Sequence, residues 1–371
     1  MSGFKELGIG EGYIKSLKEL GIKTPTEIQK RTIPLLLSQE TDVVAQAQTG
    51  SGKTAAFGLP LLESVDSNKK HVQAVILAPT RELAQQIGKQ LFKFTKYLDR
   101  KIFSEVVYGG ESIGIQIDKL RRPTQIIVGT PGRIIDLVNK KALDITKAKC
   151  LVLDEADEML SRGFKDDIEK IFSFISKERK TWLFSATIPK QLEEVIADNL
   201  AKKAVRVQIE RKKVINENIK HSYVRCEVDD KVKILISYIK AHQKERGVVF
   251  ARTKEGTKKL AHILQTKNIS CDAIHGDLLQ KERDKALRKY KKDDFKVLIA
   301  TDVAARGIDI DDIAYVVHFQ LPEISENYVH RSGRTARAGK KGEAIALVAD
   351  SERNQLDSLS SKYGIQFEEI K

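Results

Sequence analysis

Short apolar runs alternate with helical patterns along almost all of the 371 residues. Stretches such as 81–97 and 190–200 have the helical pattern. The apolar runs are 42–45, 73–78, 102–107, 125–129, 150–154, 181–185 and 205–209, and then 223–228, 247–252, 270–274, 296–300, 314–319 and 343–348. Apolar strands separated by helices indicate parallel sheets covered on both faces. The sequence therefore predicts the α/β class, with mostly parallel sheets that carry helices on both sides.

One segment interrupts this alternation. Residues 210–222 are polar and charged and have no clear apolar period, which is typical of a linker between domains. We therefore expect an N-terminal domain at 1–209, a linker at 210–222 and a C-terminal domain of similar architecture at 223–371.

The net charge narrows the choice of partner. It is +14, with a pI of about 9.4, which favours a polyanion and above all nucleic acid. A basic protein without such a partner remains the alternative on charge alone. Aromatic residues make up only 6% of the chain, which argues against binding of single strands mainly by base stacking.

The cysteine pattern and the N-terminus favour a reducing cytoplasm. Cys150, Cys226 and Cys271 form no CxxC pair and each falls in an expected strand, so we interpret them as buried free thiols. The N-terminus has no signal-peptide core, and the apolar runs are too short to span a bilayer.

The stretch AQTGSGKT at 47–54 joins an expected strand to an expected helix, which Pro60 should limit or bend. Gly50 and Gly52 allow backbone N–H groups to converge on one anion. Lys53 can reach a terminal phosphate, and the hydroxyl of Thr54 can hold Mg²⁺. This pattern predicts a nucleoside triphosphate site, although alanine stands in the first glycine position; a plain glycine-rich turn is the alternative.

A second acidic element follows an expected strand in LVLDEADEML, residues 151–160. Asp154 and Glu155 fall at the carboxyl end of that strand, where open α/β sheets bind ligands. Asp154 can hold Mg²⁺ through water, and Glu155 can polarise the attacking water. Alternatively, Glu155, Asp157 and Glu158 simply favour the start of a helix.

Three junctions between a strand and a helix have a threonine in the N-cap position, namely Thr80, Thr130 and Thr301, with Pro131 suited to a first helical turn. Helix N-termini at this edge of a sheet bind anions. The interpretation as an anion site is strengthened by Arg81, Arg133 and the Gly109–Gly110 pair. The recurrence predicts a track for a phosphate backbone, whereas each junction taken alone is better interpreted as an ordinary capped helix.

Clustered arginines occur in YVHRSGRTARAG at 328–339. If this segment is helical, Arg331, Arg334 and Arg337 lie within an arc of roughly 120° and point the same way. Such a cluster could stabilise charge on a γ-phosphate. Solvated arginines on a surface are the alternative.

Taken together, the motifs resemble those of the DEAD-box ATP-dependent RNA helicases of superfamily two, as a minimal two-domain core of bacterial type. In family order they are TPTEIQ at 24–29 after the isolated Phe4, AQTGSGKT at 47–54, PTRELA at 79–84, GG at 109–110, TPGR at 130–133, DEAD at 154–157, SAT at 185–187, VVFART at 248–253, HGD at 275–277, ATDVAARGID at 300–309 and HRSGRTAR at 330–337. The resemblance covers essentially the whole chain and implies two tandem RecA-like domains.

The resemblance also implies residue roles. Lys53, Asp154, Glu155, Arg334 and Arg337 would be catalytic, with Thr54 and Asp154 on Mg²⁺. ATP would contact Phe4, Gln29, Gln48, Thr49, Gly50, Ser51, Gly52, Lys53, Thr54 and Asp309. RNA would contact Pro79, Thr80, Arg81, Gly109, Gly110, Thr130, Pro131, Gly132, Arg133, Arg252, Gly276, Asp277, Thr301, Asp302 and Arg306. Asp157, Ser185, Thr187 and His330 would couple the two events.

The implied activity is hydrolysis of ATP, with Mg²⁺, coupled to closure of a cleft around single-stranded RNA and to local separation of short duplexes. The core is expected to be monomeric, with ribonucleoprotein partners. One alternative is an RNA clamp gated by ATP that unwinds little. The other is a DNA translocase of the same superfamily, which Gln29 and HRSGRTAR argue against.

Overall fold

The structure is a computed structural model, and it describes residues 3–38, 41–47, 50–209, 217–278, 280–305, 313–336 and 340–370. The chain divides into two compact units, unit 1 at residues 1–210 and unit 2 at residues 211–371.

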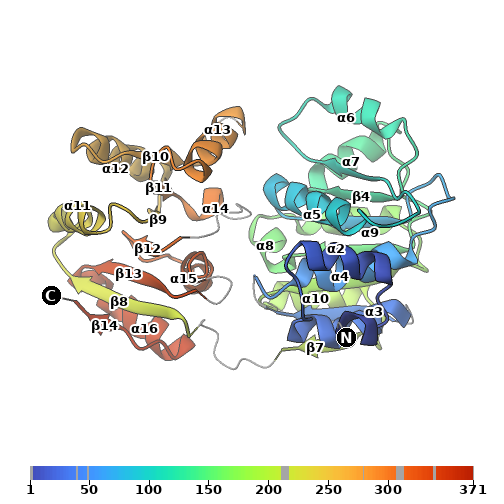
Figure 1. The fold of residues 1–371 in the computed structure, drawn as a ribbon, viewed down its shortest axis with the longest axis horizontal. Helices are drawn as coiled ribbons and strands as arrows, with labels where there is room; N and C mark the ends of the chain where they lie inside the picture. The colour runs from blue at the N-terminus through green and yellow to red at the C-terminus, as the bar shows by residue number, and fades with distance from the viewer. Residues whose placement is uncertain are drawn as a thin grey trace. The chain divides into compact units, whose positions relative to one another are not determined.

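Unit 1, blue to green in Figure 1, is built around a seven-stranded sheet in the order β3-β4-β2-β5-β6-β1-β7, in which every pair is parallel. Its strands are β1 (Val43–Gln46), β2 (Ala74–Leu77), β3 (Ser104–Val107), β4 (Ile126–Gly129), β5 (Cys150–Asp154), β6 (Lys180–Ser185) and β7 (Val205–Gln208). Its helices are α1 (Gly3–Glu6), α2 (Glu11–Glu19), α3 (Glu27–Ser38), α4 (Lys53–Ser64), α5 (Arg81–Phe94), α6 (Ile113–Leu120), α7 (Pro131–Asn139), α8 (Ala156–Ser161), α9 (Lys165–Phe174) and α10 (Lys190–Asn199).

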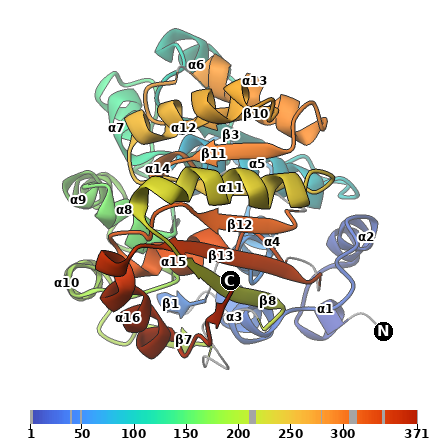
Figure 2. The ribbon, with the colours of Figure 1, turned by 90° about the vertical axis from the view of Figure 1, so that its left-hand side faces the viewer.

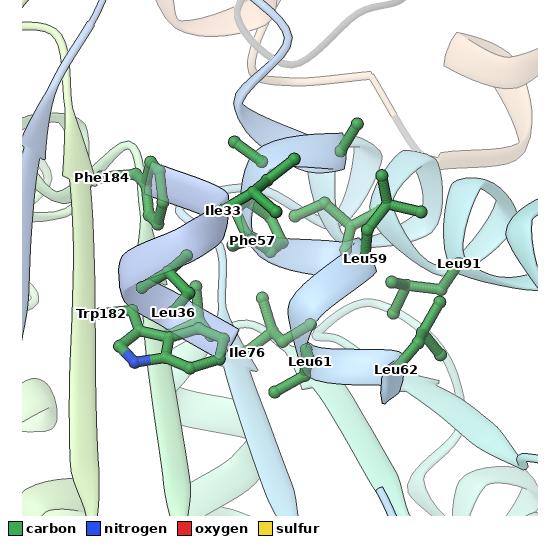
Figure 3. Close-up of a cluster of buried hydrophobic side chains, with 14 of the residues drawn as sticks. Ile33, Leu36, Phe57, Leu59, Leu61, Leu62, Ile76, Leu91, Trp182 and Phe184 are labelled. Atoms are coloured by element: carbon green, nitrogen blue, oxygen red, sulfur yellow. The ribbon is translucent and has the colours of Figure 1, made fainter. Parts of the chain in front are cut away.

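Helices bury both faces of this sheet, because successive residues of a strand point to opposite sides. Val43 and Ala45 of β1 pack with α1 to α5, whereas Val44 packs with α7 to α10. On the first face, side chains of α3 and α4 meet Trp182 and Phe184 of β6 (Figure 3). Each such side chain stabilises the unit by roughly 2 kcal/mol when fully buried.

Unit 2 contains a second seven-stranded sheet, in the order β10-β11-β9-β12-β13-β8-β14, again with parallel pairs throughout. Its strands are β8 (Ile219–Arg225), β9 (Gly247–Phe250), β10 (Cys271–Ile274), β11 (Val297–Ala300), β12 (Tyr315–His318), β13 (Gly342–Val348) and β14 (Glu368–Glu369). Its helices are α11 (Lys231–Ala241), α12 (Lys254–Thr266), α13 (Gln280–Lys291), α14 (Asp302–Ala305), α15 (Ser325–Ser332) and α16 (Arg353–Tyr363), with short 3-10 turns at Val228–Asp230 and Asp350–Glu352.

Helices cover both faces of the second sheet as well. Leu235 of α11 and Leu264 of α12 pack on one face, which Figure 2 views from the front. Tyr290 of α13 and Tyr328 of α15 pack on the other face, so α11 and α15 lie on opposite sides of β12 and β13 (Figure 1). The predicted fold class, two RecA-like domains in tandem, is confirmed.

Each strand predicted from an apolar run is present, with bounds that differ by a few residues, and the two-residue β14 was not predicted. β8 begins at Ile219, inside the segment predicted as linker. The sequence did not reveal this start because two of the buried residues, His221 and Ser222, are polar and interrupt the apolar pattern. The helix after Lys53 runs through Pro60 to Ser64 and is not ended by it. Cys226 follows β8 and is only partly buried, so its placement in a strand was wrong.

Among the described residues, no helix is long and apolar enough to cross a bilayer.

Two buried histidines lie in unit 2 between α15 and the sheet. The ring of His318 stacks on Tyr328 with centroids 4.3 Å apart, and Nδ1 of His221 lies 2.9 Å from the Tyr328 hydroxyl. Burial lowers the pKa of His221 to about 4, and it lowers that of His318 as well. Both rings are therefore neutral in the folded unit at neutral pH.

We expect unit 2 to lose stability in mild acid. Because the pKa of His221 falls from 6.5 in the unfolded chain to about 4 in the fold, the unfolded state binds more protons between these pH values. The free energy of unfolding should drop by about 2 kcal/mol between pH 7 and pH 5 from this residue alone. Hydrogen exchange of β13 amides, corrected for intrinsic rates, measures the drop. In a His221→Gln variant the drop should shrink; an unchanged pH dependence would contradict the assignment.

Candidate active site and nucleic-acid interface

The carboxyl edge of the first sheet brings the predicted site residues of unit 1 into two adjacent groups. The neighbouring strands β5, β6 and β1 lead to the DEAD, SAT and phosphate-loop residues. The neighbouring strands β3, β4 and β2 lead to Gly109 and Gly110, to 130–133 and to 79–81. Parallel strands place all these residues at one edge. A single sheet edge therefore carries the residues predicted to bind nucleotide (the nucleotide half) beside those predicted to bind an RNA backbone (the backbone-binding half).

The phosphate loop ends at the first turn of α4. Gly50 and Gly52 have φ of 82° and 92°, in the left-handed region that favours glycine. Lys53 is only 6% exposed, and its Nζ has no hydrogen-bond partner among the described residues. A buried ammonium at the start of a twelve-residue helix is suited to an anion. In the chain, Ser51 precedes Gly52 and Thr54 follows Lys53, whereas Gln48 and Thr49 lie outside the described residues.

Gln29 of α3 contacts this loop directly. Its Nε2 donates to the Gly52 carbonyl at 3.0 Å, and its Oε1 accepts from the Thr26 N–H at 2.9 Å. The side chain is 2% exposed. Gln29 therefore fixes the backbone of the phosphate loop, a contact that the sequence did not reveal. Phe4, predicted to cover the base, is fully buried in the core of unit 1 and has no exposed ring face.

We expect Gly52→Ala to be more damaging than Gly50→Ala. Both substitutions place a side chain at positive φ, which costs about 1 kcal/mol. At position 52 the new Cβ would also lie 2.4 Å from Nε2 of Gln29, whereas at position 50 it meets no described atom within 4 Å. Thermal unfolding without nucleotide should therefore show the larger loss for Gly52→Ala. Equal losses would contradict a close contact with Gln29.

The acidic pair begins where β5 ends. Asp154 is 2% exposed, and burial raises its pKa to about 7 although the charge of Lys53 acts to lower it. Glu155 adopts φ 52° and ψ 51°, and its N–H donates to Oδ1 of Asp154 at 3.0 Å. Strained backbone at non-glycine residues is concentrated at functional sites, and here it lies at the residue predicted to activate water.

Asp157 links the acidic motif to the end of β6. Its Oδ2 accepts from the N–H and the hydroxyl of Thr187 at 2.9 Å and 2.8 Å, and its own N–H donates to Oγ of Ser185 at 3.1 Å. Burial alone would raise the pKa of Asp157, but the charge of Lys53 and the bonds from Thr187 outweigh it and hold that pKa below the usual value. A movement of the Asp157 carboxylate would therefore displace Thr187 directly, because the two residues share two hydrogen bonds.

These residues suit a nucleoside triphosphate with Mg²⁺. An ammonium without a partner in the described structure fits a phosphate, and a buried carboxylate with a raised pKa fits a cation. Mg²⁺ needs only one or two protein carboxylates when phosphates and waters complete its shell. The described residues contain no group of three or more His, Cys, Asp or Glu that could hold a metal ion by themselves.

The second group of unit 1 consists of the starts of α5 and α7 and the turn at Gly109 and Gly110. The Thr80 hydroxyl accepts from the Leu83 N–H at 3.2 Å, as predicted for an N-cap, whereas Thr130 makes no such bond. Pro131 is the first residue of α7. Nε of Arg81 donates to Glu82 at 3.1 Å. A Cβ on Gly110 would lie 2.6 Å from Nη1 of Arg81, so the absence of a side chain at Gly110 leaves room for this guanidinium, whereas a Cβ on Gly109 would meet no described atom within 4 Å.

Arg133 is held by residues that sequence reasoning missed. Its Nη1 donates to Gln116 at 2.9 Å and its Nη2 to the Glu111 carbonyl at 3.0 Å. Gln116 is fully buried and also donates to the Tyr108 carbonyl and to Glu111. The sequence feature that could have indicated this role is the single amide side chain, Gln116, within the apolar pattern of residues 113–120. Gln116 therefore ties the glycine loop to the start of α7.

In unit 2 the predicted residues also share a sheet edge. The neighbouring strands β10, β11 and β9 lead to Gly276 and Asp277, to Thr301 and Asp302, and to Arg252. Asp277 forms ion pairs with Lys254 and Lys258, each at 3.1 Å. Arg252 donates to the Leu321 carbonyl at 2.8 Å. Arg306 and Asp309 lie outside the described residues.

The arginine cluster differs from its prediction. α15 carries His330 and ends at Ser332, so the continuous helix on which the predicted common direction depended is not present. Arg331 is 2% exposed and points at Asp302. Arg334 lies just after the helix and is 9% exposed, and Arg337 lies outside the described residues. The helix ends there because its C-cap, Gly333, begins a turn.

Comparisons with known proteins agree with this geometry. Residues 26–195 match the DEAD/DEAH box helicase family, and residues 230–339 match the helicase conserved C-terminal domain. The DEAD-box ATP-dependent RNA helicase CshA of Bacillus cereus is 43% identical over 97% of this chain and 68% of its own length. CshA of Geobacillus kaustophilus is 42% identical over all of this chain and 79% of its own.

Solved structures give the same result. S. cerevisiae Dbp5 bound to RNA and ADP BeF3 superposes with a TM-score of 0.91 at 32% identity, covering all of this chain and 96% of the other. A DEAD box protein from Methanococcus jannaschii is 38% identical with a TM-score of 0.58, covering 99% of each chain. The chain belongs to the DEAD-box ATP-dependent RNA helicases, which are ATP hydrolases.

Proposed function

We propose that this protein hydrolyses ATP with Mg²⁺ to separate short RNA duplexes or to remodel ribonucleoprotein particles. The observation that carries the proposal is the shared edge of the first sheet, where the nucleotide half and the backbone-binding half are neighbours. The basic charge of +14 fits an RNA partner.

On the nucleotide side, Lys53 binds the terminal phosphates and Gln29 keeps the loop in shape through Gly52. Thr54 and Asp154 would hold Mg²⁺, which would supply positive charge to neutralise the phosphates. Glu155 orients the attacking water and accepts its proton. Arg334 and Arg337 stabilise the charge that develops on the γ-phosphate.

On the RNA side, helix starts and glycine turns contact phosphates without reading bases. We propose that ATP and RNA each favour the other's binding by favouring one closed arrangement of the two units. The hydrogen bonds that link Asp157 with Thr187 and Ser185 couple the hydrolysis of ATP to the release of RNA. The RNA strand bends in the closed arrangement, which separates its partner strand.

The test is ATP hydrolysis with a single-stranded oligoribonucleotide, with the matching oligodeoxyribonucleotide and with neither, followed by strand separation of a short RNA duplex. We expect stimulation by RNA and ATP-dependent separation. Stimulation by DNA would instead favour a translocase on DNA. A long-lived complex with an ATP analogue and little separation would favour an RNA clamp.

The B. cereus relative is longer, since this chain spans 68% of it. We propose that the two units act as a monomer in the cytoplasm and that the RNA is selected by partners or flanking segments, because a backbone track carries little sequence information. Light scattering at increasing protein concentration checks the monomer.

A further inference from the structure

An ion pair buried in unit 2 joins the turn after β11 to α15. Nε and Nη2 of Arg331 donate to Oδ1 and Oδ2 of Asp302 at 2.5 Å and 2.8 Å. The Arg331 side chain is almost wholly buried. A guanidinium and a carboxylate joined by two bonds fix both direction and distance, so the start of α14 and the end of α15 are tied by a rigid link.

The rest of the guanidinium is also engaged. Nη1 of Arg331 donates to the Gln320 carbonyl at 2.8 Å, and the group lies over the Phe250 ring at 5.1 Å from its centroid. Asn327 donates to Oδ2 of Asp302 at 3.2 Å. The pair therefore joins the carboxyl ends of β11, β9 and β12. Both carboxylate oxygens of Asp302 accept hydrogen bonds from side chains of α15, so this carboxylate holds the helix in place.

α15 has a second set of contacts on the same side. Tyr328 stacks on His318, and Ser332 lies 3.1 Å from Nε2 of His318. Residues 327, 328, 331 and 332 thus hold one face of the helix, at the spacing of successive helical turns. α15 has little freedom to turn or slide independently of the sheet edge.

We infer that Asp302 and Arg331 are positioning residues that make the Thr301–Asp302 turn and α15 shift together. This inference deepens the proposed function and depends on it: Thr301 is a proposed RNA contact, and Arg334 is a proposed phosphate contact two residues after α15. RNA bound at the turn would then set Arg334 for hydrolysis within the same unit. The Asp302–Arg331 ion pair is thus the contact through which RNA binding at the turn stimulates ATP hydrolysis.

Arg331→Lys and Asp302→Asn test the link. Lysine keeps the charge and loses the fork, and asparagine keeps the shape and loses the charge. Arg225→Lys is a matched control, because Arg225 makes the same two-bond contact with Asp350, at 2.7 Å and 3.0 Å, on the exposed surface of unit 2. Circular dichroism and thermal unfolding establish which variants are folded.

We expect both test variants to lower RNA-stimulated kcat by about tenfold or more, with KM for ATP changed by less than about threefold. The control should stay within about twofold of the wild type. The double variant should be no slower than the slower single variant, because the residues act as one unit. If Arg331→Lys does not fold, the same expectation applies to Asp302→Asn.

Full RNA stimulation in a folded test variant, or multiplied effects in the double variant, would overturn the inference. So would a variant that only melts earlier while its folded fraction keeps the wild-type kcat. Wild-type protein without RNA-stimulated hydrolysis would refute the proposed function itself, which separates the two failures.

Discussion

Glu155→Gln should leave ATP and RNA bound but nearly abolish turnover. The amide keeps the size of the side chain and the same left-handed backbone, but it cannot accept a proton from the attacking water. Loss of a positioned general base costs on the order of 10²–10⁴ in kcat. Phosphate release measures turnover, fluorescence of a labelled ATP measures nucleotide affinity, and anisotropy of a labelled oligoribonucleotide measures RNA affinity.

The control for this variant is Glu193→Gln, the same change at an exposed residue that pairs with Arg206. It should hydrolyse ATP at the wild-type rate. Normal hydrolysis by Glu155→Gln would show that another group activates the water. Loss of ATP binding would instead show that Glu155 shapes the pocket.

Lys53→Met should lower kcat/KM for ATP by about 10² or more, because it removes the cation that faces the terminal phosphates. It should also raise the pKa of Asp154 further, since the charge of Lys53 acts to lower that pKa. Asp154 then holds a proton at neutral pH and is a weaker ligand for Mg²⁺. Hydrolysis measured over a range of Mg²⁺ concentrations should show a higher requirement.

A second buried lysine gives the control for Lys53→Met. Nζ of Lys231 in unit 2 forms an ion pair with Glu352 and donates to the Phe319 carbonyl at 3.3 Å. Lys231→Met should lower the melting temperature, because it leaves Glu352 without this partner. Lys53→Met should lower it less, because no described residue hydrogen-bonds its Nζ and its charge acts on Asp154 and Asp157 without such a bond. A similar fall in both variants would contradict a binding role for Lys53.

The sequence predicted the strands and their helices because a parallel sheet buried on both faces needs uninterrupted apolar runs, as at Leu151–Leu153. The positions of the candidate nucleotide residues could be predicted for a related reason. Chemistry at the end of a strand needs particular residue types at fixed spacing, so Gly52, Lys53 and Asp154 could be placed without coordinates.

The contacts that could not be predicted join residues far apart in the chain. Gln29 bonds to Gly52 because α3 packs beside α4, and Arg331 finds Asp302 because β11 and β12 bracket β9. The arc drawn through Arg331, Arg334 and Arg337 assumed a continuous helix, and the end of α15 at Ser332 removed that assumption. Charge and spacing cannot distinguish a buried arginine with a carboxylate partner from an exposed one.

The register of β2 against β5 has one further consequence. Leu77 and Leu153 are the last paired residues of these strands, so Pro79 and Glu155 each follow two residues later on adjacent strands. Neighbouring strands are about 4.8 Å apart. Under the proposed function, the residue that orients the attacking water and an RNA contact would therefore lie about one strand spacing apart, and no long chain of contacts would be needed between them.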